Sequence, residues 1–134
     1  MAANEAGIHR SIIAWLRQVM PDAIVHHSAN EGVRGGKAGM LDGVRRKGMG
    51  QVAGFPDITV LTGAYVGALF FEVKALTGKV SPDQQIILGR LDAFGYKVAV
   101  VHSIDDVRAK LCEWGVPTKE KTSLVRLPVR GVVS

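Results

Sequence analysis

Three charged residues lie in segments that otherwise look like buried β-strands. Asp57 begins the segment DITVL, and Glu72 and Lys74 lie near the end of the segment ALFFEVKA at 68–75. Charges in a buried strand are costly unless they are paired or used. Two carboxylates and an amine can together hold a divalent cation and prepare water for attack on a phosphate. These residues therefore predict metal-dependent phosphate chemistry, provided that the fold brings them together.

The two segments are expected to pair as an antiparallel hairpin. If the connection spans residues 62–67, pairing across it places Asp57 directly opposite Glu72. Opposed residues on neighbouring strands have Cβ atoms about 4.5 to 5.5 Å apart, too close for two carboxylates to stay charged comfortably without a cation. Mg²⁺ prefers oxygen ligands, so the two carboxylates and the backbone carbonyl of Val73 make a suitable site. Lys74 lies on the same face as Glu72, where it can orient water and stabilise charge on a phosphate.

A structural reading of the same residues is also open. Asp57 would then cap the start of a strand, and Glu72 and Lys74 would form an ordinary ion pair at the edge of a sheet. Against this reading, both residues follow the apolar run 69–71 in a segment that is apolar on both faces, as a central strand is. The setting therefore favours a functional role.

The remaining elements flank this hairpin in the sequence. Apolar residues recur at helical spacing from the N-cap Asn4 to Met20, and residues 23–27 can form a short strand. After the hairpin, residues 97–102 read as another apolar strand, and a further helix is expected from 103 to 115.

A helix should also begin directly after the hairpin. Ser81, Pro82 and Gln84 form a capping-box pattern, and Gly95 is placed to end the helix. Its expected core stripe consists of Ile87, Leu88, Leu91 and Phe94.

These elements predict an α/β fold with a mixed β-sheet flanked by α-helices, in the order αβββαβα. Residues 1–115 are expected to form one domain, with a glycine-rich basic loop at 31–53. Residues 116–134 form a C-terminal extension without a clear period. It could carry a short strand at 124–130 or serve as a subunit contact.

Composition favours a soluble, cytoplasmic protein with an acidic partner. The 134 residues are 47% apolar, without a run of about 18 apolar residues or a secretory signal. Cys112 is the single cysteine, so we expect neither a disulfide nor structural zinc, and Cys112 itself reads as a helix residue without chemistry. Lysine and arginine total 17 against 12 acidic residues, a net charge of +5 that suits a polyanion.

The basic charge is concentrated in the glycine-rich loop. Between residues 32 and 56, five basic residues are offset by a single acid, Asp42. The basic residues are Arg34, Lys37, Arg45, Arg46 and Lys47. Such a loop can bind a phosphate backbone and deliver it to Asp57, although a solvated loop without a partner has the same composition. No aromatic residue interrupts the basic ones, so base stacking by the loop is not indicated.

The spacing of the histidines does not indicate a second metal site. His9, His26, His27 and His102 lack metal-site spacing, and the adjacent pair in the expected strand 23–27 would point to opposite sides. We expect all four to be structural or surface residues.

The ordered motifs resemble those of the PD-(D/E)xK nuclease superfamily, and within it the virus-type replication-repair nuclease (VRR-NUC) domain. The resemblance covers residues 5–111. It rests on the successive motifs GFPD at 54–57, FEVK at 71–74, GKVSPDQ at 78–84 and GYKV at 95–98. A lone P-D with a distant E-x-K occurs by chance, but these motifs in this order are much more specific.

The resemblance implies roles for particular residues. Asp57 and Glu72 would bind Mg²⁺ or Mn²⁺, Lys74 would be the catalytic lysine, and Gln84 would lie near the active site. Gln84 could instead only complete the capping box. The family also tends to place a glutamate near the metal from the first helix, and Glu5 fits that position, although an acid in a first helical turn also complements the helix dipole.

The resemblance further implies the substrate. Single-domain members of the family are associated with viruses and bacteria and tend to form homodimers that resolve branched DNA such as four-way junctions. A phage-encoded or bacterial DNA-repair endonuclease is therefore expected. Alternatives are a catalytically silent DNA-binding module, a small-molecule α/β protein that binds a nucleotide, or a sequence-specific restriction-type endonuclease. No P-loop or G-x-G-x-x-G follows a strand, which argues against a nucleotide-binding protein.

Overall fold

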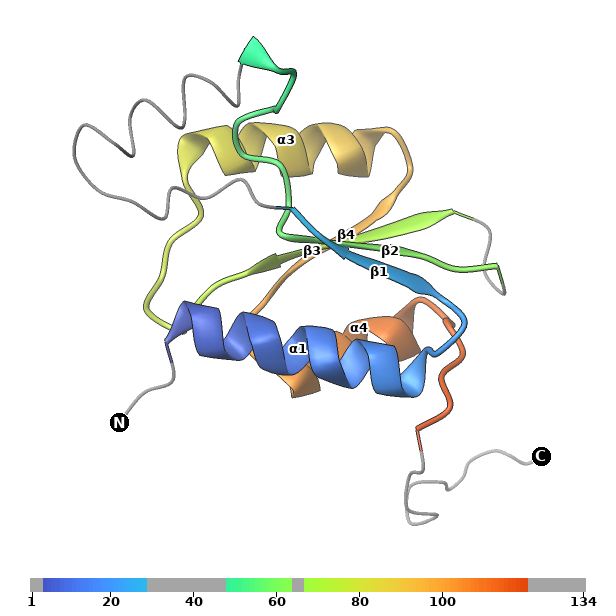
Figure 1. Ribbon diagram of the computed structural model, residues 1–134. Coiled ribbons are helices and arrows are strands. Elements are labelled where there is room, and N and C mark those ends of the chain that lie inside the picture. Colours follow the sequence, from blue (N-terminus) through green and yellow to red (C-terminus); the bar gives the residue numbers. More distant parts are fainter. Residues whose placement is uncertain (1–3, 29–47, 64–66, 121–134) are drawn as a thin grey trace.

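The computed structural model describes residues 4–28, 48–63 and 67–120. Its elements follow the expected order, as Figure 1 shows. They are α1 (Glu5–Val19), β1 (Ile24–His27), β2 (Ile58–Leu61), β3 (Ala68–Val73), α3 (Pro82–Ala93), β4 (Lys97–Val101) and α4 (Ile104–Glu113). The predicted α/β class and the αβββαβα order are therefore confirmed.

The four strands form one mixed sheet in the order β1-β2-β3-β4. β2 is antiparallel to both β1 and β3, while β4 is parallel to β3. In the β2–β3 ladder, Ile58 lies opposite Phe71, so the next step beyond the ladder puts Asp57 opposite Glu72. The register predicted for the hairpin is confirmed, and β3 is a central strand.

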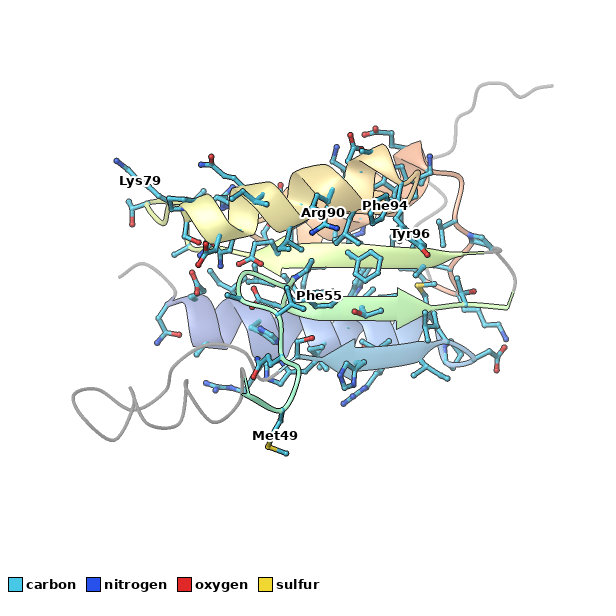
Figure 2. The ribbon with its side chains drawn as sticks, turned by 90° about the horizontal axis from the view of Figure 1, so that it is seen from above. Met49, Phe55, Lys79, Arg90, Phe94 and Tyr96 are labelled. Atoms are coloured by element: carbon cyan, nitrogen blue, oxygen red, sulfur yellow. The ribbon has the colours of Figure 1, made fainter. Side chains whose placement is uncertain are left out.

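Helices cover the two faces of the sheet unequally. α1 and α4 lie together on one face, and α3 lies on the other (Figure 1). The main core lies between the sheet and the α1–α4 pair, because the side chains there come from all of these elements. Its fully buried members include Ile12, Leu16, Ile58, Val60, Leu69, Phe71, Val73, Val101 and Val107. Seen from above, α3 lies along β4 and leaves β1 and β2 in open view (Figure 2).

This partial cover corrects one prediction about α3. The expected core stripe included Phe94, but its side chain is 65% exposed, and Leu91 is the helix residue that is buried. Phe94 is the C-cap of the helix and lies beyond the part that faces the sheet. The guanidinium of Arg90 lies 5.8 Å from its ring centroid, so the ring contacts a cation at the surface instead of the core (Figure 2).

Side chains at the helix starts explain where the helices begin. Asn4 accepts a hydrogen bond from the backbone of Gly7, and Ser103 accepts one from Asp106 at the start of α4. Ser81 and Gln84 form the predicted capping box, with Pro82 in the first turn of α3. Each cap satisfies backbone N–H groups that have no partner within the helix.

The start of the C-terminal extension packs against the domain. Val116 is buried, and the amide of Lys119 donates to the carbonyl of Val19 at 2.7 Å. Arg108 of α4 forms an ion pair with Glu120 at 2.7 Å. The segment 124–130, for which a strand or a subunit contact was expected, lies outside the described residues. In the described ranges, no helix combines the length and apolarity needed to cross a bilayer.

Candidate active site

Two buried carboxylates meet at the end of the β2–β3 hairpin. Asp57 directly precedes β2 and is 8% exposed, while Glu72 lies in β3 and is 1% exposed. The backbone N–H of Val73 donates to Oδ2 of Asp57 at 2.8 Å, which holds the aspartate beside the neighbouring strand. The expectation that the two acids face one another is therefore met.

Burial and repulsion keep Glu72 from ionising easily. The pKa of Glu72 is raised from 4.5 to about 8, first because burial removes the carboxylate from water and second because of the nearby charge of Asp57. The charge of Lys74 lowers the same pKa without offsetting these effects. A divalent cation between the acids would remove the repulsion, as the sequence predicted.

One oxygen of Glu72 is placed to bind a ligand. Within the described residues, Oε1 is buried and has no hydrogen-bond partner. A buried acceptor without a partner carries a cost in free energy that a cation would remove. The residues therefore fit a hard divalent cation, which takes oxygen ligands.

The other oxygen of Glu72 is held by two side chains. Nζ of Lys74 lies 3.6 Å from Oε2, and Nε2 of Gln84 donates to the same oxygen at 2.8 Å. The ion pair of the structural reading therefore exists, but on a central strand and not at a sheet edge. These contacts fix the orientation of the carboxylate and leave Oε1 for another ligand.

Gln84 both completes the capping box and contacts the candidate active site. Its Oε1 accepts from the backbone N–H of Ser81 at 2.8 Å, which completes the capping box. Its Nε2 reaches across to Glu72 at 2.8 Å. The amide has a donor and an acceptor end, so one side chain can anchor α3 and position the carboxylate at once.

Gly54 lets the chain approach α3 closely just before Asp57. Its φ is +83°, and a Cβ there would lie 2.5 Å from the backbone of Asp83 and 2.8 Å from the amide nitrogen of Gln84. Only glycine tolerates both the left-handed conformation and this contact. The glycine of the GFPD motif thus brings the segment that carries Asp57 against the helix that carries Gln84.

The backbone of Val73 also faces Asp57. Its N–H reaches the carboxylate of Asp57, and in a strand the N–H and C=O of one residue point to the same side. Its carbonyl oxygen is therefore on the Asp57 side of β3, where the sequence argument put a third metal ligand. On the other side of β3, the amide of Lys74 donates to Val101 in β4 at 3.0 Å.

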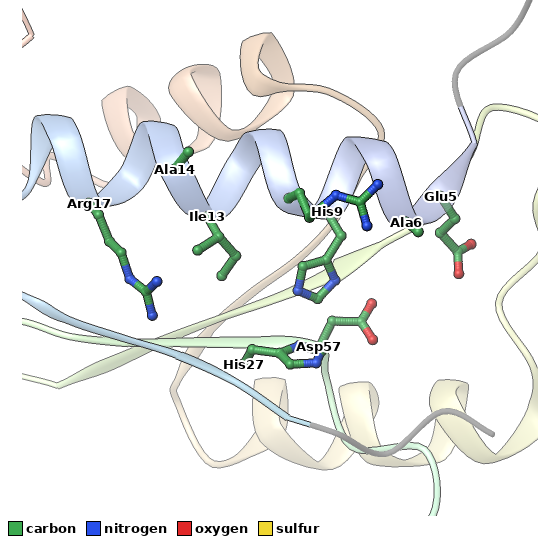
Figure 3. A pocket seen from close by; sticks show the side chains of 9 residues that line it. Glu5, Ala6, His9, Ile13, Ala14, Arg17, His27 and Asp57 are labelled. Atoms are coloured by element: carbon green, nitrogen blue, oxygen red, sulfur yellow. The ribbon is translucent and has the colours of Figure 1, made fainter. Parts of the chain in front are cut away.

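Glu5 lies close to this region, in the exposed first turn of α1. It lines the same pocket as Asp57, and Figure 3 shows both carboxylates at one end of that pocket. In the described part of the chain, no three His, Cys, Asp or Glu side chains are grouped closely enough to hold one ion. A metal-binding role for Glu5 therefore stays a prediction.

The fold also brings to the site residues for which the sequence predicted only structural or surface roles. His9 of α1 and His27 of β1 meet edge to face beside Asp57, with ring centroids 4.5 Å apart. His102 hydrogen-bonds through Nδ1 to the carbonyl of Lys74 at 3.0 Å, which steadies the end of β3. Nothing in the spacing of these histidines indicates such contacts, because each is made between elements distant in the chain.

The expected DNA-binding residues cannot be placed. Arg34, Lys37, Arg45, Arg46 and Lys47 all lie outside the described residues. Cys112 lies on α4 and is exposed, in agreement with the expectation of a helix residue.

Comparisons with known proteins identify the family of the chain. The model of the VRR-NUC domain family matches residues 12–105. The chain is also similar to a solved structure described as a VRR_NUC domain protein, with a TM-score of 0.61 and 22% identity over 85% of this chain and 89% of the other. No curated protein matches the sequence. Since the family model spans most of the chain and includes the paired carboxylates, the chain belongs to the VRR-NUC family of PD-(D/E)xK-type nuclease domains.

Proposed function

We propose that this chain is a Mg²⁺- or Mn²⁺-dependent endonuclease that hydrolyses phosphodiester bonds in DNA. The observation that carries the proposal is the buried pair of Asp57 and Glu72, with one glutamate oxygen that has no hydrogen-bond partner in the described residues. Such a pair is unfavourable as a purely structural feature, because burial, followed by the nearby charge of Asp57, raises the pKa of Glu72 to about 8. Family membership supports nuclease chemistry as the use of this pair.

The protein's own groups would each perform one task in hydrolysis. The carboxylates of Asp57 and Glu72, with the carbonyl of Val73, would hold the cation. When bound there, a divalent cation supplies Lewis acidity toward a phosphate oxygen. Lys74 would orient the attacking water and stabilise the negative charge that develops as the new oxygen–phosphorus bond forms and the bond to the leaving oxygen breaks. Gln84 would keep Glu72 in the orientation that leaves Oε1 available.

The substrate and the oligomeric state follow from the same considerations. We infer that the enzyme acts on branched DNA, as a homodimer, inside a bacterial cell. The net charge of +5 and the basic residues of the loop support a nucleic-acid partner. A two-fold dimer would offer two active sites to two strands, which suits a four-way junction.

Incubation of the purified protein with linear, flapped and four-way-junction DNA in Mn²⁺ tests the activity. Cleavage should require the metal, stop in EDTA and be strongest on the branched substrates. Unchanged cleavage in EDTA would contradict a metal-dependent mechanism. Binding without cleavage under every metal condition would favour a catalytically silent DNA-binding module.

Substitutions test the site itself. Asp57→Ala, Glu72→Ala and Lys74→Ala should each abolish cleavage while the protein remains folded, as measured by circular dichroism. Matched controls are Lys110→Ala and Glu113→Ala, because these residues form an exposed ion pair on α4, on the opposite side of the sheet. Neutralising Arg45, Arg46 and Lys47 should instead weaken DNA binding, with a smaller dependence on salt.

A further inference from the structure

The pocket that Asp57 and Glu5 line extends along α1 away from the proposed metal site. It has a volume of about 730 Å³ and lies between α1 and the ends of β1 and β2. Figure 3 shows Asp57 and Glu5 at one end and Arg17 at the other. A ligand in this pocket would therefore lie next to the atoms that hold the cation.

The middle of the pocket suits a flat aromatic ligand. The rings of His9 and His27 meet there at 85°, and Ile13 and Ala14 contribute apolar surface from α1. A phosphate alone would gain nothing from apolar surface. A nucleobase would gain, because bases stack on histidine and other planar side chains.

The far end of the pocket suits a phosphate. Arg17 lines it, and Nη2 of Arg17 donates to the backbone carbonyl of Val25 at 2.9 Å. This hydrogen bond to β1 holds the guanidinium in place while its other N–H groups remain donors. Arg17 lies twelve positions after Glu5, so the two ends of the pocket lie about 18 Å apart along the helix, enough for more than one phosphate.

We propose that this pocket binds an unpaired nucleotide next to the scissile phosphate, with its base against His9 and His27 and its neighbouring phosphate at Arg17. The inference rests on the proposed nuclease function and names its substrate class. A base in an intact duplex is stacked and paired, so it can enter such a pocket only after extrusion, which costs least when the base is already unpaired. The pocket would thus select branch points, flaps and bulges over continuous duplex.

The test measures binding by the full-length protein in EDTA, so that it does not depend on cleavage. The two probes are a paired DNA duplex containing 2-aminopurine and the same duplex with the 2-aminopurine as a single-nucleotide bulge. Fluorescence anisotropy should give a dissociation constant at least about tenfold lower for the bulge, the order expected for one stacked base. The 2-aminopurine emission should fall as the bulged base stacks in the pocket.

Substitutions of the two histidines test whether the pocket causes the preference for the bulged duplex. His9→Ala and His27→Ala should remove the preference for the bulge and leave binding of the paired duplex unchanged. His26→Ala is the matched control, because His26 is exposed, adjacent in β1 and directed to the other face of the sheet. His9→Phe keeps a planar ring and should keep the preference, which separates stacking from a loss of folding.

The outcomes distinguish this inference from the nuclease proposal. Equal affinity of the wild type for both probes, or an equal loss of preference in His26→Ala and His27→Ala, would overturn the pocket assignment. In that case cleavage of branched DNA in Mn²⁺ could still support the nuclease. A preference for the bulge without cleavage in any metal would support the pocket and contradict the nuclease.

Discussion

The two faces of β3 are buried to a similar degree, but only one of them carries a carboxyl group. On one face, Leu69, Phe71 and Val73 are completely buried against α1 and α4. On the other, Phe70 and Glu72 are also buried, yet Glu72 is a carboxyl group facing a second one, Asp57. The apolar face stabilises the fold, because burial of apolar surface is favourable, whereas the buried carboxyl group on the other face costs free energy.

This difference indicates how a small domain can hold an unfavourable site. The apolar face of β3 is packed tightly, with the rings of Phe71 and Trp114 5.6 Å apart, so the strand cannot shift to move Glu72 away from Asp57. The free energy lost at the site is offset by the core on the opposite face. Burial therefore stabilises the fold at Phe71 and costs free energy at Glu72, the next residue along the same strand.

Glu72→Gln should have the largest effect, and it should change cleavage without lowering stability. The amide has the shape of the glutamate without its charge, so we expect metal-dependent cleavage to fall by roughly a thousandfold or more, the upper range for loss of one electrostatic group in an active site. Stability should not fall. Cleavage rates in Mn²⁺ and the thermal midpoint, measured side by side, test this, and a variant that loses both would break the comparison.

Phe71→Ala tests the apolar face next to it. Removal of a fully buried phenylalanine should lower the free energy of unfolding by about 3 to 5 kcal/mol, because a cavity remains in the core. Urea titration of the variant against the wild type measures this loss. A loss of unfolding free energy near zero would mean that the core on this face does not support the site.

The pH dependence of the metal-free protein should sharpen the comparison. Because the pKa of Glu72 is raised in the folded state to about 8, its contribution to stability is complete below pH 4.5 and is lost as pH rises to about 8. The loss can reach about 1.4 kcal/mol per pH unit. The difference in unfolding free energy between wild type and Glu72→Gln measures this contribution of Glu72. As pH rises across this range, the variant should become more stable relative to the wild type.

The same proton competes with the metal. Below about pH 8 a cation must displace it from Glu72, so metal affinity should rise about tenfold per pH unit. Isothermal titration of Mn²⁺ into the wild type at several pH values measures this slope. An affinity that is flat with pH would mean that Glu72 is already ionised.

The smallest effects should come from the capping box, where the two roles of Gln84 can be separated. Ser81→Ala removes a cap and should cost about 1 kcal/mol of stability while cleavage stays close to that of the wild type. Gln84→Ala also removes the hydrogen bond to Glu72, so cleavage should fall by about tenfold to a hundredfold. Equal cleavage by the two variants would show that the contact between Gln84 and Glu72 has no part in activity.

The sequence by itself predicted the elements and the paired acids. Short-range patterns were sufficient, because the connection between β2 and β3 is short and fixes which residues face each other. The register that puts Asp57 opposite Glu72 followed from the lengths of the two strands and of the turn. The caps at Asn4 and Ser81 were equally local, since each involves residues within one helical turn.

Only the tertiary structure decided the contacts between elements that are distant in the chain. The reach of Gln84 to Glu72, the meeting of His9 with His27 and the exposure of Phe94 depend on where each helix lies on the sheet. No local period contains that information. The position of each helix is set by the packing of the whole core, to which many side chains contribute together.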